Sequence, residues 1–183
     1  TLLAIHFDEA FIGLFSMAFT FTFRPMNILN SVYDKVLYER VSTKYLNNQP
    51  FLKDIIRFFG YNYLVALPLF VVAFIFAEPI LTLLLGVEWA DTAVYFRYML
   101  PWIFMMLISS SISFIPNIFS TQRTEAFMYV LLFIARIIVL AIGIRLNDFA
   151  LAIKLFCITG TGFSCIITAW YFKLMLNHKN YSV

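Results

Sequence analysis

The sequence predicts an all-α protein, a polytopic transmembrane helix bundle with five full spans and the stub of a preceding span. Of its 183 residues, 62% are hydrophobic and only 13% are charged, whereas a soluble domain is closer to about half apolar and about a quarter charged. Apolar stretches long enough for a helix to cross a bilayer recur along the chain. A charged residue followed by proline, Arg24-Pro25, stands inside the first of these stretches.

The first full span is expected from about residue 10 to residue 33. The chain before it opens on TLLAI, which is typical of the end of an apolar helix, so we expect the chain to be the C-terminal part of a longer one. Pro25 is expected to kink the span, because proline removes one backbone hydrogen bond and clashes with the preceding turn. Apolar residues at helical spacing then continue until the run NNQP at 47–50 ends the helix.

Four more spans are expected after this helix. The second covers residues 58–77, which include no charged residue and carry Pro68 in their middle. The third covers about 92–119, after an apolar run at 80–86 that is too short to cross a bilayer. The fourth, 125–144, is interrupted by Arg136, and the fifth, about 149–176, has Lys154 near its start. No soluble domain is expected.

The distribution of basic residues between alternating loops predicts a cytoplasmic C-terminus. With that orientation, the segments on the cytoplasmic side hold Lys35, Arg40, Lys44, Lys53, Arg57, Arg123, Lys173 and Lys179. The other side holds only Arg97 and Arg145. An excess of basic residues marks the cytoplasmic side of a membrane protein.

A stripe of small and polar residues follows one side of the first span. At about 100° per residue, its members are Gly13, Ser16, Thr20, Arg24, Asn27, Ser31 and Asp34. Small residues alone would favour a close-packed helix interface. A charge in mid-membrane costs about 2.5 kcal/mol or more, so Arg24 and Asn27 favour the alternative, the wall of a water-filled cavity.

Two other basic residues lie within spans. Arg136 is either a second cationic cavity residue or half of a buried pair with another helix. Glu125, Tyr129 and Gly143 share its side of the helix. Lys154 is close enough to its span's outer end to snorkel, although it lies on one face with Cys157, Thr161, Ser164 and Thr168. Ser109, Ser113 and Asn117 form a polar line on the third span, and we expect such hydroxyls to bond to carbonyls of their own helix.

Several kinds of chemistry lack the residues they need. No acid lies in the interior of a span, and no Cys/His cluster has the spacing of metal ligands. The run Gly160-Thr161-Gly162 lacks the lysine of a phosphate-binding loop. No catalytic residues, metal or cofactor are therefore expected, and the abundant aromatic residues indicate lipid contact and packing instead of nucleic-acid binding.

Two blocks of sequence carry a family resemblance. The first joins Ile12-Gly13-Leu14-Phe15, Arg24-Pro25 and VLYERVS at 36–42. The second runs from Leu67-Pro68-Leu69 through FAEPI at 76–80 and LLLGVEW at 83–89 to FRYMLP at 96–101. Together they resemble the C-terminal half of polysaccharide flippases, which export O-antigen and related lipid-linked oligosaccharides and belong to the superfamily of MATE transporters.

The resemblance implies that residues 1–183 form the C-terminal lobe of a twelve-helix transporter in the bacterial inner membrane, completed by an N-terminal lobe. Such a transporter moves a polyprenyl-pyrophosphate-linked glycan across the bilayer by alternating access. Arg24, Asn27, Arg136 and Lys154 would contact the anionic, polar cargo in a central cavity. Pro25 and Pro68 would act as hinges, and any acid that couples transport to an ion would lie in the N-terminal lobe.

Two alternatives stay open at this point. A MATE-like drug or cation exporter would use acids within the membrane, and this sequence places only bases there. A membrane enzyme of polysaccharide assembly would need a sizeable outer loop or a clustered acid/base set. The longest outer loop, 78–91, is mostly apolar.

Overall fold

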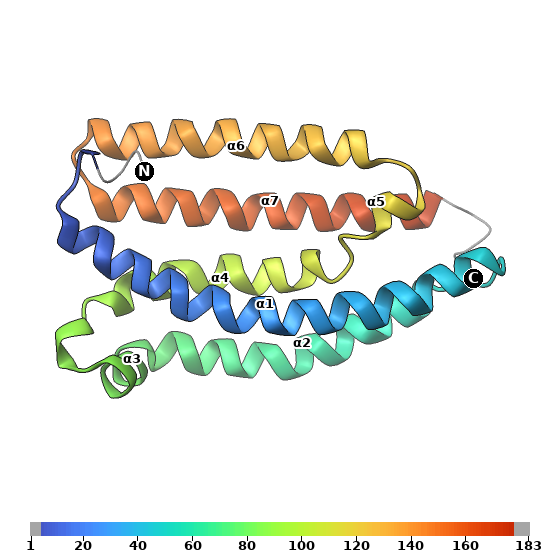
Figure 1. Ribbon diagram of the computed structural model, residues 1–183, viewed down its shortest axis with the longest axis horizontal. Coiled ribbons are helices and arrows are strands. Elements are labelled where there is room, and N and C mark those ends of the chain that lie inside the picture. Colours follow the sequence, from blue (N-terminus) through green and yellow to red (C-terminus); the bar gives the residue numbers. More distant parts are fainter. Residues whose placement is uncertain (1–4, 178–183) are drawn as a thin grey trace.

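The fold of the computed structural model is all-helical, as expected, and the structure describes residues 5–177 apart from the side chains of residue 25 and residues 28–36. Within this range the helices are α1 (Glu9–Leu46), α2 (Leu52–Ile75), α3 (Ala77–Leu85), η2 (Val87–Trp89), α4 (Thr92–Ser110), α5 (Ile115–Ile118), α6 (Gln122–Arg145) and α7 (Phe149–Asn177). The long helices run side by side, with α6 and α2 at opposite edges (Figure 1). Most of the stub expected before the first span, residues 1–4, lies outside the described residues.

Helix α1 is one continuous helix of 38 residues. The Asp8 carboxylate caps its start by accepting a hydrogen bond from the backbone N–H of Ala10, at 3.1 Å. At its end the side-chain amide of Asn47 donates to the Thr43 carbonyl at 2.9 Å. The backbone stays helical through Pro25. The side chain of Pro25, which is expected to act as a hinge, lies outside the described residues.

Four of the helical segments within residues 5–177 are long and apolar enough to cross a membrane, namely Leu52–Ile75, Thr92–Ile118, Gln122–Arg145 and Phe149–Asn177. These correspond to the second to fifth expected spans. The first expected span is helical as the start of α1, but it falls short of the same apolar criterion. Arg24 and Asn27 lower its mean hydropathy, since both side chains are strongly polar. The expectation of five spans is therefore confirmed for four.

The third span is broken near its end, which the sequence analysis did not anticipate. Helix α4 ends at Ser110, and residues 111–114 form turns before the short α5. Pro116 stands at the start of α5, where it has no N–H to donate to a preceding turn. The Ser111 hydroxyl donates to the Leu107 carbonyl at 2.8 Å, so it satisfies a carbonyl that the interrupted helix leaves free.

Helix α4 is the centre of the bundle. In the most apolar stretch of the segment Thr92–Ile118, 61% of the residues are buried, whereas the corresponding share is 6% in each of the edge helices α2 and α6. It passes through both clusters of buried side chains, one around Met99, Trp102 and Ile103 and the other around Ile108 and Ile112. Helices α1 and α7 pack on it, so α4 fixes their relative positions.

An ion-pair cluster joins the end of α1 to the start of α2. The Asp54 carboxylate accepts a hydrogen bond from Arg40 at 2.9 Å and another from Lys44. Lys53 and Arg57 lie on the exposed side of α2. The joint therefore remains basic after Asp54 has neutralised part of its charge.

We predict that Gly143→Val will destabilise the contact between α6 and α7. A Cβ atom on Gly143 would lie 2.3 Å from the Cβ and 2.6 Å from the Cα of Ala152, so the backbones must separate. Overpacking of this kind costs about 1–3 kcal/mol, and the melting temperature of the purified full-length protein should fall. Gly60→Val is the control, since its Cβ would meet no atom within 4 Å. Equal melting temperatures for the two variants would contradict the prediction.

Candidate functional site

The polar stripe of α1 faces away from the helix on which α1 packs. Ala18, Thr22 and Met26 are buried, and Thr22 and Met26 border α4 residues such as Phe96 and Ile103. Arg24 and Asn27, on the opposite side of the helix, are exposed, as is Ser16. Ser31 and Asp34, which were assigned to the same stripe, lie outside the residues whose side chains are described. The described part of the stripe is therefore not a packing interface between α1 and α4.

The contact made by Phe23, the residue before Arg24, shows how far along the bundle Arg24 lies. The Phe23 ring lies 5.1 Å from the ring of Trp102, edge to face. Trp102 stands near the middle of α4, ten residues after its start at Thr92, about 15 Å along the helix. Because α4 belongs to a segment long and apolar enough to cross a membrane, Arg24 is level with the middle of that segment.

Arg136 lies at the same level, on α6. Its guanidinium carbon is 4.5 Å from the centre of the Trp102 ring and 4.2 Å from that of Phe156 on α7. The side chain is half-buried, and its Nε atom is buried without a hydrogen-bond partner among the described residues. Within that part of the chain no salt bridge involves Arg136, since both ion pairs there use Asp54.

Lys154 is the third basic residue within an expected span. It precedes Phe156 by two residues on α7, about 3 Å of helix rise, and the Phe156 ring is 5.5 Å from that of Trp102. Its side chain is exposed. The structure thus brings Arg24 and Arg136 to about one depth beside Trp102, whereas Lys154 lies nearer the start of α7, six residues before the Gly160 that borders the Trp102 ring. Among the described residues, no salt bridge or hydrogen bond neutralises Arg24 or Lys154.

The side of α6 that carries Arg136 packs on α7 along its length. Glu125 accepts a hydrogen bond from the Tyr171 hydroxyl at 2.5 Å, and the Tyr129 ring lies 5.1 Å from the Phe163 ring. Gly143 packs against Ala152. The prediction that Glu125, Tyr129 and Gly143 share the side of Arg136 is therefore confirmed. The cation at the centre of this side meets aromatic rings where the sequence analysis considered a polar partner.

The grooves in the bundle surface are apolar. One, of about 330 Å³, lies between α6 and α7 and is lined by Met128, Leu131, Leu132, Ala135, Thr159, Gly162, Phe163 and Ile166. Two others of about 200 Å³ flank α4 and border α2. None of these three is lined by Arg24, Asn27, Arg136 or Lys154. These three grooves therefore do not hold the candidate cargo-binding residues.

The family comparison matches the first half of the chain. Residues 1–95 match the family described as "Polysaccharide biosynthesis protein". The chain belongs to this polysaccharide biosynthesis protein family, which is of the flippase type. No curated protein and no solved structure matches the sequence. With its four apolar spanning helices, this polysaccharide biosynthesis protein is a multi-pass membrane protein.

Several hydroxyl groups along α4 and α7 bond to their own helices. The Ser109 hydroxyl donates to the Met106 carbonyl at 3.2 Å. On α7, Thr161 donates to the Cys157 carbonyl at 2.9 Å and Thr168 donates to that of Ser164 at 2.6 Å. The expectation that such hydroxyls bond to their own backbone is confirmed for Ser109. Among the side chains that the structure describes, no group of three His, Cys, Asp or Glu residues could hold a metal ion.

Two residues, Trp102 and Tyr171, make contacts between helices that were not predicted from the sequence. Trp102 was read only as part of an apolar span, although a tryptophan in mid-span departs from the usual place of this residue at the membrane interface. Tyr171 is fully buried and bonds to Glu125 across 46 residues of sequence. The sequence offered no signal for that pair, because helix periodicity does not say which helices are neighbours.

We predict that Tyr171→Phe will destabilise the polysaccharide biosynthesis protein by about 1–3 kcal/mol, because it leaves the half-buried Glu125 carboxylate without its donor. Thermal unfolding of the purified full-length protein in detergent measures the change. Tyr61→Phe is the control, as the Tyr61 side chain is 67% exposed. An unchanged melting temperature for Tyr171→Phe would show that the bond contributes nothing to stability.

Proposed function

We propose that this chain is the C-terminal lobe of a membrane transporter that flips a lipid-linked oligosaccharide across the bacterial inner membrane by alternating access. The observation that carries the proposal is the polar face of α1. It presents Arg24 and Asn27 away from α4, at the level of a mid-span residue. Membership of the polysaccharide biosynthesis family supports a glycan as the cargo.

The chemistry of this face suits a polyprenyl-pyrophosphate-linked glycan. A guanidinium donates paired, charge-assisted hydrogen bonds to phosphate oxygens, and the Asn27 amide offers a donor and an acceptor to sugar hydroxyls. Arg136 lies at a similar depth and Lys154 lies nearer the start of α7, and both would add positive charge around the anionic head group. A cation exposed in mid-membrane is costly unless water or an anion accompanies it, and the pyrophosphate would be that anion.

Alternating access requires helices that bend. In our proposal Pro25 and Pro68 provide the bending points, since each proline removes one hydrogen bond from its helix. Pro68 lies inside α2, which packs less extensively than any other spanning helix except α6. A weakly packed helix can bend with little loss of contacts.

We predict that Arg24→Ala will reduce export of the surface glycan about tenfold or more at equal protein level, because a charge-assisted hydrogen bond contributes about 1.5–3 kcal/mol. Arg24→Lys should retain part of the activity, since it keeps the charge without the planar fork. The measurement is the amount of surface glycan per membrane-inserted protein in cells that depend on the variant.

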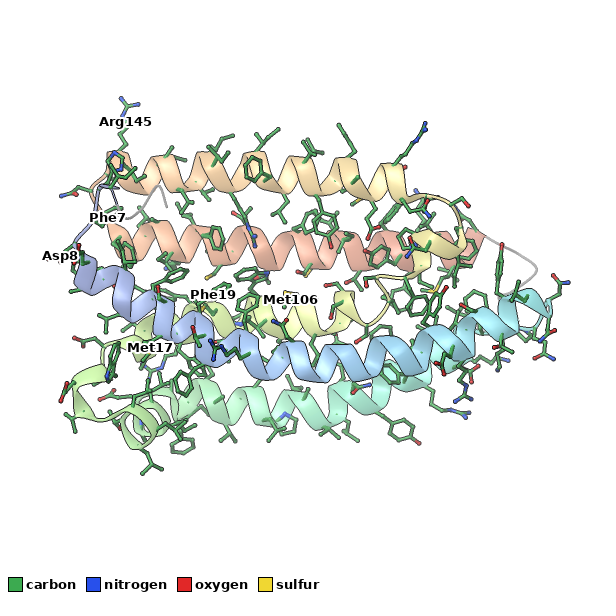
Figure 2. The ribbon with its side chains drawn as sticks, viewed as in Figure 1. Phe7, Asp8, Met17, Phe19, Met106 and Arg145 are labelled. Carbon is green, nitrogen blue, oxygen red and sulfur yellow. The ribbon has the colours of Figure 1, made fainter. Side chains whose placement is uncertain are left out.

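Arg145→Ala is the matched control for Arg24→Ala. Arg145 ends α6 and extends away from the bundle, at the same end as Phe7 and Asp8 (Figure 2). Its loss should leave export unchanged. Normal export by Arg24→Ala would contradict the cargo-binding role of Arg24.

We predict that the C-terminus faces the cytoplasm. The end of the bundle that holds the last turn of α7 also carries the exposed side chains of Arg40, Lys53, Arg57 and Arg123, so the positive-inside rule assigns it to the cytoplasm. A reporter that is active only in the cytoplasm should be active when it is fused after residue 183. A reporter that requires the periplasm should be inactive there, and the reverse pattern would invert the topology.

A further inference from the structure

Trp102 is the contact point of three other helices. Its side chain is 6% exposed. It meets the Phe23 ring of α1 at 5.1 Å and the Phe156 ring of α7 at 5.5 Å, each edge to face. Arg136 of α6 lies over its ring with the guanidinium carbon 4.5 Å from the ring centre. One indole thus touches both the helix of Arg24 and the side chain of Arg136.

A glycine makes room for this indole. A Cβ atom on Gly160 of α7 would lie 2.7 Å from two atoms of the Trp102 ring, which is too close for any side chain to occupy. Gly162 stands two residues further on the same helix, and a Cβ atom there would meet nothing within 4 Å. Of this pair, only Gly160 is required by the position of Trp102.

The aromatic faces replace the polar partners that a cation in the membrane would otherwise need. Nε of Arg136 is buried and lacks a hydrogen-bond partner in the described range, and no salt bridge within that range reaches the side chain. A free arginine stem would bend to carry its charge toward the nearest membrane surface. Stacking on Trp and Phe faces holds a guanidinium in place, and tryptophan is the strongest such partner.

We propose that Trp102 is a positioning residue for Arg136, and that Gly160 sets the place of Trp102. Trp102 itself does not contact cargo in this proposal. It keeps the guanidinium of Arg136 at the depth of Arg24, so that both can act on one anionic head group. This consequence for transport rests on the proposed function, whereas the positioning of Arg136 does not.

The first experiment measures how accessible Arg136 is, independently of transport. Purified full-length protein is treated with phenylglyoxal, which modifies arginine, and the peptide that contains Arg136 is quantified by mass spectrometry. Trp102→Leu should increase the modification rate about tenfold, since it removes the ring face, and Trp102→Phe should give an intermediate rate. Gly160→Ala should also raise the rate, while Gly162→Ala should match the unsubstituted protein.

The second experiment changes the electron density of the ring and leaves its shape nearly unaltered. Biosynthetic replacement of tryptophan by a difluorotryptophan weakens the negative face that attracts a cation. In the unsubstituted protein it should raise the modification rate of Arg136. In Trp102→Phe the same replacement should have no effect, because only the other tryptophans carry fluorine. This comparison stays valid if Trp102→Leu or Gly160→Ala fails to fold.

Two results would overturn the positioning role. One is a modification rate of Arg136 that changes neither when tryptophan is fluorinated nor when Trp102 is substituted. The other is an equal response to Gly160→Ala and Gly162→Ala. Surface glycan export is then measured in the same strains. Loss of export in Trp102→Leu supports the link to transport, and unchanged export overturns that link. Failure of the unsubstituted protein to export glycan would refute the proposed function and leave the modification result standing.

Discussion

The packing of α4 against its neighbours is the constraint on which the rest of the bundle depends. α4 is mostly buried while α2 and α6 expose most of their apolar surface, so the positions of α1 and α7 follow from how each fits α4. Trp102 is central to that fit, because its ring meets Phe23 on one side and Phe156 on another. The close approach of α7 to this ring is possible only because Gly160 has no side chain. An aromatic residue and a glycine therefore set the spacing of the helices that carry the basic residues.

The basic side chains of this bundle are accommodated in two different ways. At the joint of α1 and α2, Arg40 and Lys44 share the Asp54 carboxylate as an ion-pair partner, as expected where carboxylates and water are available. Beside Trp102, Arg136 forms no salt bridge with a described residue and is accommodated by the quadrupoles of aromatic rings. Arg24 and Lys154 have neither a carboxylate nor an aromatic face as a partner among the described residues, and both side chains are exposed. Unneutralised charge at membrane depth is the feature that an anionic cargo would satisfy.

Much of the fold was predictable because the membrane imposes a strong pattern on sequence. The ends of α6 and α7 lie within three residues of the expected limits, since a bilayer requires about 20 apolar residues for each span, whereas α2 begins six residues before the expected span. The break after Ser110 was not predicted, although Pro116 and the serine run stood in the sequence. The mean hydropathy of a span hardly changes with one proline or a few serines, whereas a single residue of this kind can interrupt the backbone hydrogen bonds of a helix. The start of α1 was expected to be a full span because of its apolar run, but Arg24 and Asn27 keep it outside the segments that are apolar enough to cross a membrane.

By itself, the sequence determined the helical membrane class, the polar stripe of α1 and the shared side of Arg136, Glu125, Tyr129 and Gly143. These are properties of single helices, and a period of 3.6 residues fixes which side chains share a face. Only the tertiary structure decided what each face meets. It turned the stripe of Arg24 away from α4, bonded Glu125 to Tyr171 and set Arg136 over Trp102. Contacts between helices depend on the shapes of side chains far apart in the chain, and periodicity along one helix carries no record of them.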